Sequence, residues 1–423
     1  MATDTGLSQV FPIASRLNER GRLEIGGCDV IELARDFGTP AYIVAEEDLR
    51  ARAQAFLRAG QTHGDFHVLF ASKACPCTAV LEVFAQEGLW CDVASGGELH
   101  LALGAGFPAD RIVMHGNAKS FTELQMALRA NVRLIVIDNF DEIDRLERAL
   151  GQDGAPGGEQ EVLLRVTPDV RGETHEKIST GQADSKFGFS MADAAEAIER
   201  VGGIGGLSLT GLHAHIGSQL FDLGPFGLAL AALSSLGDFP VLDIGGGLGI
   251  AYLESQHPPA IEDYVAEILA AARNHGAASA RLLIEPGRAL VANSCVTSYT
   301  VESVKQNVSR WVAVDGGMSD NLRPMLYGAV YEAHVADRFG GSTPCVLAGK
   351  HCESGDVIVR KARLDDPRAG DVIVVPATGA YGYAMASNYN GITRPPVIFC
   401  RDGDARVVVR RENFDDLTAR DVH

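Results

Sequence analysis

Eight apolar runs of strand length alternate with segments of helical periodicity, and this alternation restricts the fold more than any other feature. The runs are His67–Ser72, Leu89–Ala94, Arg111–His115, Arg133–Asp138, Glu161–Val166, Leu209–Ile216, Val241–Ile244 and Arg281–Ile284. Helical stretches between them include Ala79–Glu87, Phe121–Arg129, Asp141–Leu150, Met191–Val201 and Ile261–Asn274. Strands joined by helical crossovers form parallel sheets. An open doubly wound sheet is the alternative, but eight units favour a closed, TIM-like (β/α)8 barrel.

After Pro286 the chain changes to short β-rich segments joined by Gly, Pro and Asp turns. These segments are Cys295–Val304, Trp311–Val314, Cys345–Ala348, Asp356–Val359, Asp371–Val375 and Ala405–Arg410. They predict a second, all-β domain. We therefore expect a barrel over residues 40–290, and a β-domain made of residues 1–39 and 291–423.

Composition excludes several classes of partner. A formal net charge of −18 argues against binding to nucleic acid or to anionic membranes. No apolar run reaches the roughly 20 residues of a membrane span, and the N-terminal residues do not resemble a secretory signal. The eight cysteines are scattered, which suits reduced thiols in the cytoplasm. No Cys/His spacing resembles a zinc site, so we expect no metal.

Polar or glycine residues stand at the ends of all eight expected strands. They are Lys73; Asp92; His115 with Asn117; Asp138; Arg165; His215 with Ser218; Gly245-Gly246-Gly247; and Glu285 with Arg288. Barrel enzymes carry their chemistry at the C-terminal ends of the strands. The sequence therefore predicts a site built from these residues.

Lys73 is either a lysine that reaches solvent from a strand end or a lysine that forms a Schiff base. Gly245-Gly246-Gly247-Leu248-Gly249 is either a tight turn or a loop that lets backbone N–H groups approach a phosphate. It differs from the G-x-G-x-x-G dinucleotide fingerprint.

Glu285 and Arg288 form either an internal ion pair or a pair of ligands for a pyridine nitrogen and an anionic group. His213 and His215 alternate on one expected strand, so only one of them should face the barrel interior. A histidine among these residues favours stacking on a flat ring. An imine-forming lysine, a phosphate loop, an acid for a ring nitrogen and a stacking ring together indicate pyridoxal 5′-phosphate (PLP).

Several motifs resemble one family. Phe70–Ala74, Lys186–Phe189, Leu212–Gln219, the triple glycine and Glu285–Arg288 resemble the fold-type III PLP-dependent decarboxylases. Asp315–Ala329 and Gly349–Asp356 resemble the diaminopimelate-decarboxylase branch of that family, of the actinobacterial kind. The resemblance runs from about Phe11 to the C-terminus and implies the barrel and β-domain described above.

The resemblance also implies roles. Lys73, His215 and Cys352 would be catalytic: Lys73 would bind PLP covalently, His215 would stack on its ring, and Cys352 would return a proton. Cofactor contacts would come from Asp92, Ser218, Gly245, Gly246, Gly247, Glu285, Gly287, Arg288 and Tyr381. Substrate contacts would come from Arg288, Arg323, Tyr327, Glu353 and Tyr381. The β-domain would complete the site of a partner subunit, in a head-to-tail homodimer.

The implied reaction converts meso-2,6-diaminopimelate to L-lysine and carbon dioxide in the cytoplasm. Two alternatives remain: decarboxylation of another basic or carrier-bound amino acid, and binding of PLP without turnover. An intact lysine, acid and thiol argue against the second alternative, because a binding module needs no proton donor.

Overall fold

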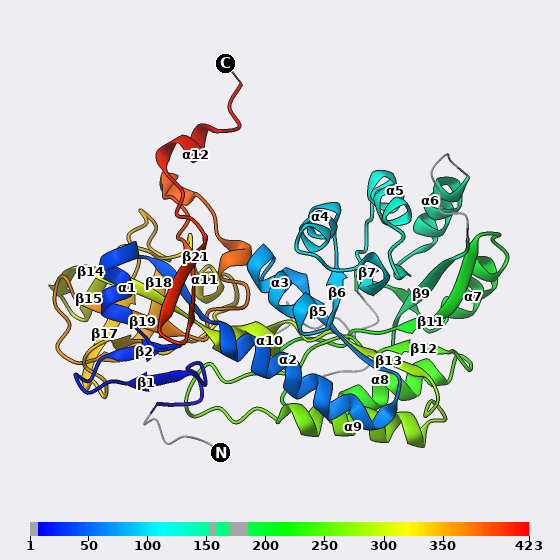
Figure 1. Cartoon of the computed structure of the whole chain (residues 1–423), viewed down its shortest axis with the longest axis horizontal. Coiled ribbons are helices and arrows are strands. Elements are labelled where there is room, and N and C mark those ends of the chain that lie inside the picture. Colours follow the sequence, from blue (N-terminus) through cyan, green and yellow to red (C-terminus); the bar gives the residue numbers. More distant parts are fainter. Residues whose placement is uncertain (1–6, 152–157, 169–184, 423) are drawn as a thin grey trace. The chain divides into compact units, whose positions relative to one another are not determined.

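The computed structural model describes residues 7–151, 158–168 and 185–422, and these fall into two compact units (Figure 1). The described residues of Arg52–Gly249 and Pro258–Ala289 form one unit. Those of Met1–Ala51, Ile250–His257 and Leu290–His423 form the other, which is rich in β-structure.

The first unit is a closed barrel of eight parallel strands. They are β5 (Phe66–Ala71), β6 (Trp90–Val93), β7 (Ile112–Met114), β8 (Leu134–Ile137), β9 (Gln160–Thr167), β11 (Leu207–His213), β12 (Val241–Asp243) and β13 (Arg281–Ile284). The sheet order is β9-β11-β12-β13-β5-β6-β7-β8, and β8 pairs with β9 to close it. A short strand, β10 (Phe189–Ser190), adds to β9. The predicted barrel is thus confirmed, and its closure excludes the open sheet.

Helices connect or flank the barrel strands. They are α2 (Glu46–Gly60), α3 (Thr78–Gln86), α4 (Gly96–Gly104), α5 (Phe121–Ala130), α6 (Phe140–Leu150), α7 (Ala194–Gly202), α8 (Gly224–Ser234), α9 (Ile261–Asn274) and α10 (Arg288–Val291). Figure 1 shows α4, α5 and α6 on one side of the barrel strands and α8 and α9 on the other. In a closed barrel, helices cover the outer face of the strands and side chains fill the interior. The strands are therefore buried on both faces, which explains their continuous apolar sequences.

Capping residues fix where two of these helices begin, next to the strand ends. Ser120 accepts the N–H of Glu123, whose side chain accepts the N–H of Ser120, so α5 starts with a capping box. Asn139 caps α6 and also donates to the carbonyl of Asn117. The loop from His115 to Lys119 is therefore held between two defined helix starts.

The β-rich unit contains a nine-stranded sheet. Its strands are β4 (Ala41–Ala45), β14 (Cys295–Gln306), β15 (Arg310–Val314), β16 (His334–Val335), β17 (Thr343–Ala348), β18 (Val357–Leu364), β19 (Val372–Pro376), β20 (Val397–Arg401) and β21 (Asp404–Val409). A separate three-stranded sheet has β1 (Ser15–Leu17), β2 (Leu23–Ile25) and β3 (Cys28–Asp29). The short helices of this unit are α1 (Val30–Phe37), α11 (Arg323–Tyr327) and α12 (Phe414–Thr418).

The N-terminal segment and strand β4 both belong to the β-rich unit. Val10, Leu23 and Val30 share a buried core with Val296 and Ile398. Strand β4 pairs with β14 and β20, whereas the sequence-based boundary at residue 40 had placed it with the barrel. All five of its residues are buried, so its apolar pattern fits a central strand of a mixed sheet, antiparallel to β14 and parallel to β20, as well as a barrel strand.

Within the described part of the chain, no helix combines the length and apolar character that a membrane crossing requires.

Candidate active site

Lys73 stands in a short turn directly after β5. The turn, Ser72–Ala74, is tied to the next strand end, because Ser72 Oγ donates to Glu98 Oε2 over 2.8 Å. The same oxygen accepts the N–H of Ala94, also at 2.8 Å. The sequence offered no reason for a serine at position 72. In the structure, Ser72 anchors the turn that carries the lysine.

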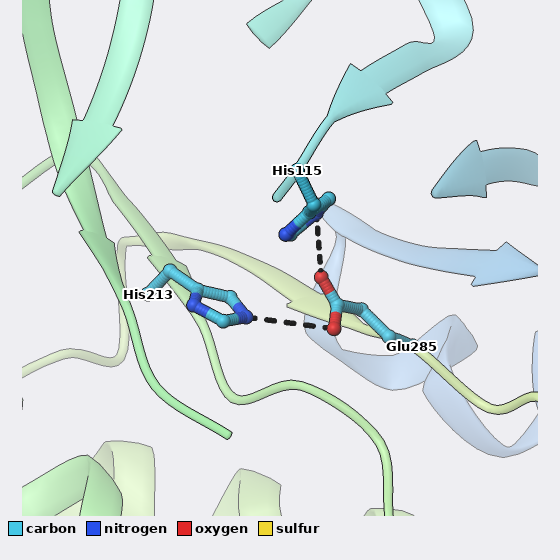
Figure 2. Close-up of side chains that lie close together, drawn as sticks. All are labelled: His115, His213 and Glu285. Atoms are coloured by element: carbon cyan, nitrogen blue, oxygen red, sulfur yellow. Dashed lines mark hydrogen bonds and ion pairs between the residues drawn. The ribbon is translucent and has the colours of Figure 1, made fainter. Parts of the chain in front are cut away.

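Glu285 lies at the end of β13, buried between two histidines (Figure 2). His115 Nε2 is 2.8 Å from Glu285 Oε1, and His213 Nε2 is 3.5 Å from Oε2. The two imidazole rings meet edge to face, with centroids 5.0 Å apart. Burial alone raises the pKa of Glu285, but the two histidines outweigh it and hold that pKa well below its usual value. The carboxylate is therefore ionised.

The pKa values of the two histidines shift in opposite directions because their neighbours differ. Burial lowers the pKa of His213 to about 4, since Glu285 opposes the effect only in part, so this ring is neutral at pH 7. Burial also lowers the pKa of His115, but Asp92 and Glu285 together outweigh it and raise that pKa above its usual value. Burial raises the pKa of Asp92 to about 6, against the charges of His115 and Lys73. His115 is thus the histidine that is protonated more readily beside Glu285.

His215 lies beyond the strand, and this corrects one expectation. Strand β11 ends at His213, so His215 stands in the following loop, where strand alternation no longer applies. His215 Nδ1 accepts the N–H of Gly246 at 3.1 Å. Burial, above all, and then the charge of Lys73 lower the pKa of His215 well below its usual value. Both histidines contact residues of the site: His213 contacts Glu285, and His215 contacts the glycine loop.

The predicted phosphate loop follows β12. Gly247 has φ +129°, and a Cβ there would lie 2.7 Å from the carbonyl oxygen of Gly217, so only glycine fits. Nearby, Arg288 Nη2 donates to Ser218 Oγ at 2.9 Å. Gly287 packs against the lysine turn, where its Cβ would be 3.1 Å from the Cβ of Ala74. The structure thus brings together Ser218 with Arg288, and Gly287 with the turn that carries Lys73.

Three buried ionisable residues near these strand ends escaped the sequence analysis. Asp243, at the end of β12, accepts the N–H of Gly245, and its pKa is raised well above the usual value by burial and then by Glu285. Lys119 Nζ lies 2.8 Å from Glu142 Oε1, and both side chains are almost completely buried. Lys119 also donates to the carbonyls of Gly116 and Val136. It therefore supports the loop that begins with His115.

The barrel residues suit PLP. Lys73 offers an amine, the glycine loop and Ser218 offer a polar cradle free of side-chain bulk, and Glu285 offers an ionised carboxylate for a pyridinium nitrogen. One nitrogen of His115, one nitrogen of His213 and one oxygen of Glu285 also lie within 4.8 Å of one another, a spacing that could hold a metal ion. The expectation of no metal stays a prediction.

Four of the five residues expected to bind substrate lie in the β-rich unit, whereas Arg288 lies in the barrel unit. Arg323 opens α11 and is buried, its guanidinium 4.7 Å from the ring centre of Tyr252 and hydrogen-bonded to the hydroxyl of Tyr331. Arg323 is therefore not a solvated surface arginine, because the two tyrosines enclose its guanidinium and hold it in one orientation. Tyr327, at the end of α11, is half-buried. Tyr381 is also half-buried, with φ +62° in the loop after β19.

Cys352 and Glu353 lie in an exposed loop between β17 and β18. Of the eight cysteines, Cys352 alone is exposed, and none forms a disulfide. Its N–H donates to Asn390 Oδ1 at 2.8 Å, so the loop has a fixed backbone although its side chains are open.

Comparison with known proteins supports the expected family. Residues 46–292 match the family described as pyridoxal-dependent decarboxylase, pyridoxal binding domain. A diaminopimelate decarboxylase from Actinosynnema pretiosum subsp. auranticum is 45% identical, covering 100% of this chain and 96% of the relative. The one from Bacillus subtilis (strain 168) is 44% identical, covering 96% of this chain and 97% of the relative.

Solved structures agree. The diaminopimelate decarboxylase from M. jannaschii in complex with L-lysine matches with a TM-score of 0.91 and 32% identity, covering 97% of this chain and 98% of that one. Both the sequence and the structural matches extend over nearly the whole chain. The chain therefore belongs to the pyridoxal-dependent decarboxylase family, and within it to the diaminopimelate decarboxylases.

Proposed function

We propose that this protein decarboxylates meso-2,6-diaminopimelate to L-lysine and carbon dioxide, with PLP as its cofactor. The observation that carries the proposal is the full-length match to diaminopimelate decarboxylases, which includes the β-rich segments with Arg323 and Cys352. The buried cluster around Glu285 supplies the chemical support, because it is suited to a charged pyridine ring. Decarboxylation of another basic or carrier-bound amino acid remains the alternative.

The barrel residues bind and orient the reactants. When bound, PLP supplies a protonated ring that accepts the electron pair released as carbon dioxide leaves. The ionised carboxylate of Glu285 would keep the proton on the ring nitrogen. His115, at 2.8 Å, and the hydrogen bond from His213 favour the ionised form of that carboxylate. The amine of Lys73 would be the covalent attachment point, and His215 would stack on the ring. Ser218 and the glycine loop would hold the phosphate.

The β-rich residues select the substrate and complete the reaction. Diaminopimelate carries both an amine and a carboxylate at its far end, whereas ornithine and lysine carry only an amine. Arg323 binds that carboxylate as a bidentate clamp, and Glu353 binds the amine. The thiol of Cys352 delivers a proton to the substrate α-carbon after carbon dioxide departs.

We infer that the enzyme works as a head-to-tail homodimer in which each β-rich unit completes the site of the other subunit. The exposure of Cys352 and Glu353 supports this, because a proton donor must be covered from water during turnover. Mixing inactive Lys73→Ala protein with inactive Cys352→Ala protein should restore part of the activity, since hybrid dimers contain one intact site. Absence of recovery despite demonstrated subunit exchange contradicts the shared site.

We further propose that the enzyme acts in the cytoplasm, where thiols stay reduced. All eight cysteines are free, and seven of them are buried.

The reaction itself is tested with purified protein and PLP incubated separately with diaminopimelate, ornithine, lysine and arginine. Products are identified by mass spectrometry, and carbon dioxide release is measured in parallel. We expect L-lysine from diaminopimelate at a rate far above the rates on the other three. A higher kcat/KM on one of the others would reassign the substrate, and no turnover of any would support a binding protein.

A further inference from the structure

We propose that Asp356 is a positioning residue that holds the Cys352 loop and the Arg323 segment in one fixed arrangement. The inference rests on the proposed function, because it concerns the two residues expected to protonate and to bind the substrate. Asp356 precedes β18, and its side chain is 1% exposed.

The carboxylate of Asp356 receives donors from two separate segments. Oδ1 accepts the N–H of Met318 at 2.8 Å, and Met318 belongs to the loop that leads into α11 and Arg323. Oδ2 accepts the N–H of His351 at 2.9 Å and lies 2.7 Å from His351 Nδ1. His351 directly precedes Cys352. One buried carboxylate therefore joins both segments.

Backbone contacts make this junction tight. Lys350 N–H donates to the carbonyl of Gly316 at 2.9 Å, and Asp356 N–H donates to the carbonyl of Glu353 at 3.1 Å. Gly317 has φ +152°, and a Cβ there would be 2.5 Å from Asp356 Oδ2. Only glycine therefore lets the loop approach the carboxylate this closely.

Each segment also has an anchor of its own. The carboxylate of Asp320 accepts the hydroxyl of Tyr299 at 2.5 Å and the N–H of Gly317 at 2.8 Å. Asn390 Oδ1 accepts the N–H of Cys352. These anchors keep each segment folded, so Asp356 is the side chain whose loss changes the position of one segment relative to the other.

The test replaces Asp356 with asparagine, which keeps the shape but turns one acceptor oxygen into a donor that faces backbone N–H groups. Asp48→Asn is the matched control, because Asp48 is equally buried in the same unit and accepts the N–H of Ile13, away from both segments. Three quantities are measured on the PLP-loaded enzyme: kcat and KM on diaminopimelate, the melting temperature, and the alkylation rate of Cys352 by iodoacetamide, followed by peptide mass spectrometry.

For Asp356→Asn we expect kcat to fall roughly tenfold to a hundredfold, as losing hydrogen bonds to a charged group implies. We expect the alkylation rate of Cys352 to change at least about threefold, and the absorption of bound PLP to stay as in the wild type. Asp48→Asn should leave kcat and the alkylation rate of Cys352 within about twofold of the wild type. This should hold even if its melting temperature falls as much as that of Asp356→Asn.

If both rates in Asp356→Asn match the wild type, or change only as much as in the control, the positioning role is wrong. Should Asp356→Asn fail to fold, His351→Phe serves instead: it removes the Nδ1 donor but keeps a ring stacked on Tyr389. It should change kcat and alkylation in the same sense, and unchanged values overturn the proposal. Alkylation needs no substrate, so it still decides the question if the wild type proves inactive on diaminopimelate and the proposed function fails.

Discussion

Removing Lys119 should destabilise the barrel strongly, because its ammonium group is buried with three acceptors. Its Nζ lies 2.8 Å from Glu142 Oε1 and donates to the carbonyls of Gly116 and Val136. In Lys119→Met the methionine fills the space but leaves an unpaired buried carboxylate. Breaking a buried pair from one side costs about 3–5 kcal/mol. The double variant Lys119→Met/Glu142→Leu removes both charges and should lose only about 1–3 kcal/mol.

The loss in Lys119→Met should grow with pH. Burial already raises the pKa of Glu142 even though Lys119 opposes the effect, and without the lysine it rises further. The folded state then binds the proton more tightly than the unfolded state. The contribution of Glu142 to the free energy of unfolding is therefore greatest below its unfolded pKa of about 4.3. This contribution is lost as pH rises through its folded pKa. Between pH 6 and pH 8 the additional loss is up to about 2.7 kcal/mol.

The two tryptophans allow the barrel to be followed by itself. Trp90 is buried on β6 and stacks on His67 with ring centres 4.3 Å apart, while Trp311 lies in the β-rich unit. In a Trp311→Phe background, urea unfolding followed by Trp90 fluorescence gives the barrel transition at each pH. The reasoning is refuted if the double variant is no more stable than Lys119→Met, or if the single variant loses the same free energy at both pH values.

Three further predictions concern the active site. Lys73→Ala should abolish borohydride-reducible attachment of PLP while the circular dichroism spectrum stays native, and a surviving adduct would point to another lysine. Arg323→Gln should lower kcat/KM on diaminopimelate by roughly ten- to a few-hundredfold, with little change on any weak lysine turnover; an equal loss on both compounds means that the arginine is structural. Glu285→Gln should lower kcat at least about a hundredfold with PLP still bound, because a neutral amide cannot hold the ring nitrogen protonated; activity within tenfold of wild type contradicts that role.

The barrel could be predicted because its strands are buried on both faces and its helices mostly have one polar face. Most expected strand ends lie within two residues of the observed ones, but the strand expected to end at Ile216 ends three residues earlier, at His213. The strand therefore stops before His215, so a rule based on alternation failed. Helix α8 (Gly224–Ser234) was not anticipated, because it is apolar throughout and has no polar face to mark its period. Strand β4 was assigned to the barrel because local pattern carries no information about its partners.

The part of the candidate site that could be predicted consists of chemically distinctive residues at strand ends. Lys73, Glu285 and the glycine loop stand out because their types match a cofactor. The pairing of Lys119 with Glu142 could not be foreseen, since a lysine and a glutamate on different helix starts usually belong to the solvated surface. Likewise, Asp356 ends the Gly349–Asp356 motif, but nothing in the sequence shows that it joins two segments, because its partners are mostly backbone groups.

Because of the pairing of β4, the order in which the chain is synthesised affects how it folds. This strand leaves the ribosome early, yet its partners are Cys295–Ser298 of β14 and Val397–Cys400 of β20. The barrel strands emerge in between, so the barrel can close while β4 still has two open edges. Such an apolar strand is prone to pair with other chains while it waits. Truncation before β20 should therefore yield a chain with a folded barrel that aggregates through its N-terminal segment.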